Sequence, residues 1–88
     1  MMRLKIAEIG KGLHPSETVV SVNTVTGTER LVVSKRSIEA GYISVGYPLG
    51  TKDSTTLVEL PRETQTGAWR VWVSDDQLSS TKEERLRA

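Results

Sequence analysis

The sequence predicts an all-β domain in which five or six short antiparallel strands form a small, partly open barrel of the SH3-like or OB-like kind. Two observations support this prediction. The apolar runs are short, alternate with polar residues and are rich in β-branched side chains, which is typical of half-buried strands. Turn-forming residues separate these runs at close intervals, as in small barrels. An α+β arrangement, a three- or four-stranded sheet covered by a C-terminal helix, is the alternative.

The chain length fits one domain. Eighty-eight residues are enough to bury a single apolar core. We assign residues 1–78 to this domain and residues 79–88 to a charged tail that is frayed or disordered. The tail has too few apolar side chains to hold a helix by itself. The sequence contains no cysteine, which excludes disulfides and thiolate zinc sites.

Charge and hydropathy limit the partners of the protein. Twelve basic and eleven acidic residues give a formal net charge of +1. Duplex nucleic-acid binders, by contrast, draw most of their non-specific affinity from an excess of Lys and Arg. The first residues lack the apolar run of a signal peptide, and no segment reaches the roughly 18 apolar residues of a membrane span. We therefore expect a cytoplasmic protein without a membrane partner.

The N-terminal third predicts a strand followed by a hairpin. Met2–Ile9 alternates as a strand does, and the glycines at 10 and 12 should end it. Glu17–Lys35 predicts a hairpin with Thr26-Gly27 in the loop, although a longer loop around 25–28 is an alternative. In the first case, the opposed pairs are Val25 with Thr28, Val22 with Leu31 and Val20 with Val33. One face should then bury Val20, Val22, Leu31 and Val33, and the other should expose Asn23 and Arg30.

The middle of the chain predicts shorter elements. Ser37–Gly41 resembles a single helical turn closed by glycine, with Ile38 covering one end of the core. Tyr42–Val45 predicts a short strand with Ile43 and Val45 inward. Residues 46–50 should form an extended loop, and Thr51–Ser54 a turn.

The C-terminal part predicts a second pair of strands. Thr55–Leu60 and Ala68–Val73 alternate, and Arg62–Gly67 should connect them after Pro61 ends the first strand. Ser74 and Gln77 have the spacing of a helix capping box. No internal repeat is evident in the sequence.

The two tryptophans provide the main functional signal. On a strand, Trp69 shares one face with Val71 and Val73, which predicts that Trp69 lies in the core. Trp72 lies on the other face beside Arg70, and Trp and Arg are over-represented among residues that dominate binding energy at interfaces. The sequence therefore predicts a contact surface around Trp72.

We interpret the protein as a non-enzymatic module that binds a protein partner or a second copy of itself. Four residues are the candidate binding set: Trp72, Arg70, Lys35 and Arg36. The alternative function is nucleic-acid binding, in which a ring stacks on a base beside a basic groove. The near-neutral net charge makes this second function less favoured.

No motif predicts catalysis, a cofactor or a metal. The single histidine, His14, precedes a proline and is expected on an exposed loop rather than as a general base. The glycine-bearing loops at 10–12 and 46–50 lack the spacing of phosphate-binding loops. Glu59 and Glu63 flank Pro61 without the defined geometry of a catalytic carboxylate pair.

Overall fold

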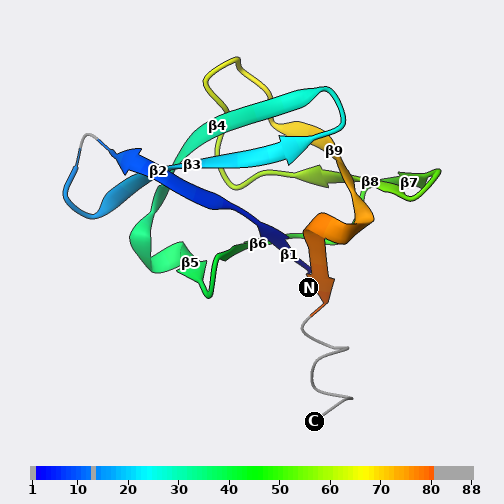
Figure 1. Cartoon of the computed structure of the whole chain (residues 1–88), viewed down its shortest axis with the longest axis horizontal. Coiled ribbons are helices and arrows are strands. Elements are labelled where there is room, and N and C mark those ends of the chain that lie inside the picture. The colour runs from blue at the N-terminus through cyan, green and yellow to red at the C-terminus, as the bar shows by residue number, and fades with distance from the viewer. Residues whose placement is uncertain (1, 13, 81–88) are drawn as a thin grey trace, which may run out of the picture.

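A computed structural model describes residues 2–12 and 14–80, and it is all-β, with three small antiparallel sheets in an open, barrel-like arrangement (Figure 1). Sheet A has the order β10-β1-β6-β5, sheet B the order β2-β3-β4, and sheet C the order β7-β8-β9. The helical segments of the described residues are two single 3-10 turns, η1 (Lys35–Ser37) and η2 (Asp75–Gln77). The strands are β1 (Met2–Lys5), β2 (Ala7–Lys11), β3 (Glu17–Thr24), β4 (Gly27–Ser34), β5 (Ile38–Glu39), β6 (Tyr42–Val45), β7 (Gly50–Lys52), β8 (Thr55–Glu59), β9 (Arg70–Ser74) and β10 (Leu78–Ser80).

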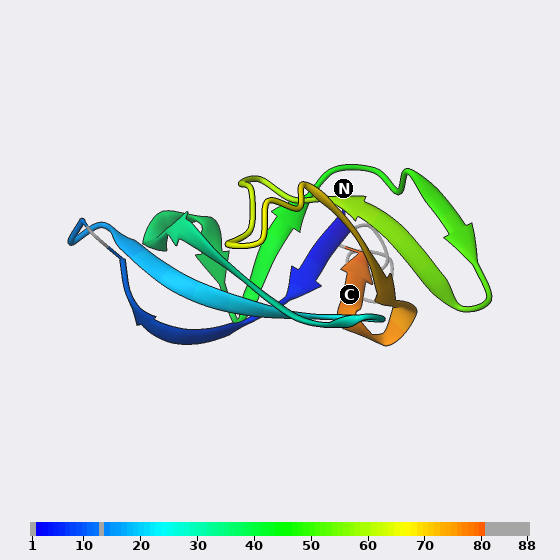
Figure 2. The ribbon, with the colours of Figure 1, turned by 90° about the horizontal axis from the view of Figure 1, so that it is seen from above.

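The apolar core receives side chains from all three sheets. Figure 2 shows sheets B and C curving over different parts of the molecule, with β1, β6 and β10 between them. The core residues are Leu4, Ile6, Val20, Val22, Leu31, Val33, Ile43, Val45, Val58, Leu60, Val71 and Val73. Because β-branched side chains dominate this set, the core is built from rigid side chains that fit a pleated surface.

The β3–β4 hairpin confirms the predicted faces and corrects the predicted register. Val20, Val22, Leu31 and Val33 are buried, and Asn23 and Arg30 are exposed. Thr24 pairs with Gly27, so the pairing differs by two residues from the prediction. The Thr24 hydroxyl donates to the Gly27 carbonyl at 2.6 Å and accepts from the Thr26 amide at 3.3 Å, which closes the turn one residue earlier. A shift of two keeps every side chain on its face, because the strand period is two.

The first predicted strand is divided and longer than expected. The chain passes from sheet A to sheet B at Ile6, whose amide donates to the Gly41 carbonyl at 3.0 Å. β2 then continues through Gly10 to Lys11, with a register shift between Glu8 and Gly10. Glycine at a bulge disturbs the ladder without ending the strand. Such passages between sheets explain why the described residues form ten short strands rather than five or six.

A hairpin replaces the helical turn predicted at Ser37–Gly41. The helical segment lies earlier, at Lys35–Ser37, where the Ser34 hydroxyl accepts from the Arg36 amide at 3.3 Å. Ile38 is partly buried against the core, as expected. β5 and β6 then meet across Ala40 (φ 53°) and Gly41 (φ 84°), the two positive φ angles that a tight hairpin turn requires.

The second half contains a hairpin where a loop and turn were expected. β7 pairs with β8 across Asp53 (φ 49°) and Ser54 (φ 64°). Asp tolerates the left-handed conformation better than most residues. The strand predicted over Thr55–Leu60 is present as β8 and ends before Pro61.

The C-terminal region forms a strand after η2. Ser74 makes no side-chain capping bond, so the predicted capping box does not form. Asp75 Oδ1 instead accepts from the Thr56 hydroxyl at 2.6 Å. β10 pairs with β1, which places Ser79 and Ser80 in sheet A although we assigned them to the tail. The rest of the expected tail, residues 81–88, lies outside the described residues.

The fold is internally duplicated. The segment from β1 to β5 and the segment from β6 to β10 have the same order of strands, and each has a 3-10 turn before its last strand. Sheet A contains two strands of each half, and its order is unchanged when the halves are exchanged. The amide of Lys35 donates to Ser16, and the amide of Asp75 donates equivalently to Ser54, at 2.8 and 3.0 Å. The matching strand pairs are Thr18–Val33 with Thr56–Val73, Val20–Leu31 with Val58–Val71, and Gly10–Val19 with Gly50–Leu57.

Candidate binding site

Trp72 lies on the outer face of sheet C. It pairs with Leu57 on β8, and Leu57 pairs with Gly50 on β7, so the three residues form a row across the sheet. A Cβ at Gly50 would lie 3.7 Å from the Cη2 of Trp72, so the indole reaches across β8 as far as β7. The neighbours Val71 and Val73 point into the core on the opposite face. Trp72 is half-buried, because the row supports one side of the ring and leaves the other accessible.

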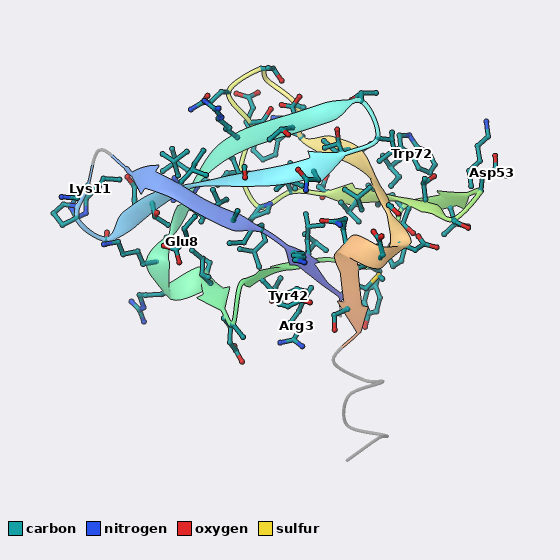
Figure 3. All side chains as sticks on the ribbon, viewed as in Figure 1. Arg3, Glu8, Lys11, Tyr42, Asp53 and Trp72 are labelled. Carbon is teal, nitrogen blue, oxygen red and sulfur yellow. The ribbon has the colours of Figure 1, made fainter. Side chains whose placement is uncertain are left out.

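A groove of ≈ 390 Å³ lies over Trp72, and it is called the Trp72 groove below. The β3–β4 turn forms one wall, and the Val25 amide fixes this turn by donating to the Trp72 carbonyl at 2.9 Å. The β7–β8 turn contributes the charged rim. Figure 3 shows Trp72 and Asp53 at the same end of the molecule. The lining residues are Val25, Lys52, Asp53, Thr55 and Trp72.

The groove combines an apolar floor with a few polar groups. Val25, which lines the groove with Trp72, is 53% exposed. Within residues 2–12 and 14–80, the indole N–H of Trp72 donates to no protein atom, so it is available to a ligand carbonyl. The Thr55 hydroxyl is occupied, since it donates to the Lys52 carbonyl. The site can therefore hold an apolar side chain and one hydrogen-bond acceptor.

The prediction that Trp69 lies in the core is wrong. Trp69 is 51% exposed, and its Nε1 donates to Glu63 Oε2 at 3.0 Å. It precedes β9, and its carbonyl accepts from the Leu60 amide at 2.7 Å. Its side chain lies beyond the end of the core, where alternation no longer decides burial. Trp72 is the less accessible of the two indoles.

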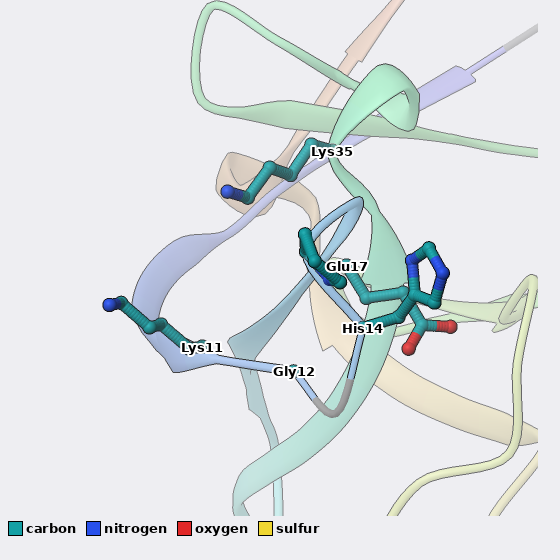
Figure 4. A pocket seen from close by; sticks show the side chains of 6 residues that line it. Lys11, Gly12, His14, Glu17 and Lys35 are labelled. Carbon is teal, nitrogen blue, oxygen red and sulfur yellow. The ribbon is translucent and has the colours of Figure 1, made fainter.

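The four predicted binding residues do not form one patch. Arg70 is at the start of β9, where its Nε lies 3.3 Å from Glu59 Oε2. Lys35 lines a different pocket together with Lys11 (Figure 4). Figure 3 places Lys11 at the opposite end of the molecule from Trp72. Arg36 follows Lys35 in η1 and is exposed.

The remaining polar candidates make local contacts. His14 is exposed, and its Nδ1 lies 2.7 Å from the Ser16 hydroxyl. Glu59 and Glu63 contact different partners, Arg70 and Trp69 respectively. No group of three or more His, Asp or Glu side chains in the described part of the chain is arranged to hold a metal ion.

Sequence reasoning did not identify Val25, Lys52 or Asp53 as site residues. They lie in two turns that are far apart in sequence and are brought together by sheet packing. The available signal was the exposed valine at the tip of a hairpin, where a polar residue is usual.

The part of the chain that the structure describes contains no helix long and apolar enough to cross a membrane. The chain matches no protein-family model, and comparison with curated proteins and with solved structures finds no similar chain.

Proposed function

We propose that this protein is a binding module that receives an apolar side chain of a partner protein in the Trp72 groove. The supporting observation is an accessible indole in a groove bordered by two turns. Trp anchors are frequent where binding energy is concentrated. The equivalent row in the first half of the fold is Gly10, Val19 and Val32, so the large ring is specific to the second half.

The expected ligand is an extended peptide segment. The volume of ≈ 390 Å³ is at the lower end of the range of about 300–1,000 Å³ for small-ligand pockets, which suits one or two side chains. The indole N–H can donate to a backbone carbonyl of the segment. Lys52 and Asp53 at the rim offer charges of both signs, which can orient a peptide without favouring a polyanion.

The separation of Lys35 and Arg36 from Trp72 supports a peptide over a nucleic acid. A single-stranded nucleic acid needs stacking rings beside a continuous basic groove. Arg70, the basic residue nearest to Trp72 along the strand, is paired with Glu59.

Selection of peptides from a random display library tests the proposal. Selected peptides should contain a large apolar residue, and Trp72→Ala should weaken their binding at least about tenfold, measured by fluorescence anisotropy. Trp69→Ala is the matched control and should bind normally, because Trp69 lies outside the groove. In NMR spectra, peptide binding should change the amide chemical shifts mainly of the residues that line the groove.

Two results would contradict the proposal. One is a library that yields no peptide with an apolar anchor. The other is binding that Trp72→Ala leaves unchanged while Trp69→Ala abolishes it. Labelled single-stranded DNA and RNA, tested in parallel at moderate salt, should give no change in anisotropy.

A further inference from the structure

The two 3-10 turns are equivalent in the fold but opposite in charge. η1 contains Lys35 and Arg36, whereas η2 contains Asp75 and Asp76 at the corresponding positions. All four side chains are exposed. Figures 1 and 2 show the two turns well apart, on either side of the central strands β1 and β6. The surfaces at these two turns are therefore opposite in charge, although the net charge is only +1.

A pocket lies beside η1. Its volume is ≈ 340 Å³, and the lysines lining it are Lys11 and Lys35, whose side chains extend in the same direction in Figure 4. Glu17 also lines the pocket, but it is paired with Arg62 at 3.4 Å. Among the described residues neither lysine has an ion-pair partner. The pocket, called the basic pocket below, therefore offers two uncompensated ammonium groups.

The η2 turn presents a carboxylate in a fixed position. The Thr56 hydroxyl holds Asp75 in place. Asp76 is exposed, and its carboxylate accepts a hydrogen bond from the side-chain amide of the adjacent Gln77 at 3.3 Å. Asp76 is thus available to a cation on another molecule.

We propose that copies of this chain associate head to tail, with the η2 turn of one copy seated against the basic pocket of the next. A contact between two different surfaces leaves one surface of each kind free, so the assembly can extend. Attraction between exposed charges is weak and screened by salt, so the association should require high protein concentration. The basic pocket and the Trp72 groove share no lining residue, so this proposal and the proposed function fail independently.

Sedimentation equilibrium of the full chain tests the proposal. At about 0.02 M salt, the average mass should rise above the 9.7 kDa of the monomer as protein concentration approaches roughly 1 mM. At about 0.5 M salt, it should return to the monomer value, because screening then acts within a few ångströms.

Charge-reversed variants test the two surfaces directly. Lys35→Glu/Arg36→Glu reverses the charge at η1, and Asp76→Lys reverses the exposed charge at η2. Each variant alone should associate at least about tenfold more weakly than the wild type. An equimolar mixture should recover association, since each variant then supplies the charge that the other requires. Thermal melting confirms that both variants are folded.

Two controls distinguish this contact from other causes. Arg30→Glu alters charge in the middle of β4, away from both turns, and should associate like the wild type. Trp72→Ala should do the same. A wild type that stays monomeric at low salt, a reversed variant that associates normally, or a mixture that stays monomeric would each overturn the proposal.

Discussion

Individual side chains follow strand alternation only where the sheet has a core to face. Val71 and Val73 are buried as their period requires, whereas Trp69, two residues earlier, is half exposed. A sequence pattern gives the face of a residue but not the point at which the core ends. That is why Trp72 was predicted on the correct face while Trp69 was not.

Glu29 should make stability depend on pH in the acid range. The Thr66 hydroxyl donates to Glu29 Oε1 at 2.7 Å, and this bond, with a further contribution from Thr64, lowers the pKa of Glu29 below its ordinary value. Because the folded-state pKa is the lower one, the stabilisation is complete above the ordinary pKa and is lost as pH falls through the folded-state value. We therefore expect Glu29→Gln to lower the melting temperature at pH 7.

The difference between this variant and the wild type should shrink as the pH falls through the folded-state pKa of Glu29, because the side chain then becomes protonated in the folded chain as well as in the unfolded chain. Melting temperatures of both proteins across this range provide the measurement. A constant difference between the two curves would contradict the assignment.

Turns are the elements that sequence patterns described least well. The hairpin faces, the strand at Tyr42–Val45 and the strand before Pro61 were predictable, because alternation and proline chemistry act locally. The turn at Ala40-Gly41 was not, since Ala is a poor signal for positive φ. The pairing of β10 with β1 depends on residues at the two ends of the chain, which no local pattern connects.

Two substitutions in the Ala40-Gly41 turn should change the stability of the protein in opposite directions. Ala40→Gly should stabilise the protein by about 0.5–1 kcal/mol, because relief of left-handed strain exceeds the added entropy of the unfolded chain. Gly41→Ala should destabilise it by about 1–2 kcal/mol, since φ is 84° there. Urea unfolding measures both. Equal effects of the same sign would show that the turn has another conformation.

Gly12 should be far less replaceable than Gly10. A Cβ at Gly12 would lie 2.7 Å from the Cβ of Glu17, whereas a Cβ at Gly10 would meet nothing within 4 Å. We expect Gly12→Ala to cost about 1–3 kcal/mol through overpacking and Gly10→Ala to stay within about 0.5 kcal/mol of the wild type. Chemical denaturation of the two variants measures these changes in stability. A Gly12→Ala variant as stable as the wild type would contradict the close approach of Gly12 to Glu17.

At the scale of the whole molecule, the two halves should fold as one unit, because sheet A contains strands of both. Val33→Asp and Val73→Asp each bury an unpaired carboxylate, at a cost of several kcal/mol. Either change should therefore abolish native amide signals in both halves. Val32→Asp, on the partly exposed face, is the control and should remain folded. Native signals persisting in the unsubstituted half would contradict a shared core.

The duplication leaves only a faint trace in the sequence. Thr18–Val22 reads TVVSV and Thr56–Leu60 reads TLVEL, with the same positions buried in each. The segments before the two 3-10 turns, RLVVS and RVWVS, are equally close in pattern. Such patterns are common to many short β-strands, so a match between two segments is weak evidence of a repeat. The loops between the segments also differ in the two halves, which hides the repeat.

The Ala40-Gly41 turn is the single connection between the two equivalent halves, as expected if the protein evolved by duplication and fusion of a shorter chain. Two identical chains of about half this length, meeting through their β1-type strands, would form the same sheet A as a symmetric pair. Joining them in one chain releases each copy from the need to match the other. Val32 and Trp72 on one face, and Lys35 and Asp75 on the turns, are the differences that such a fusion permits and that a homodimer forbids.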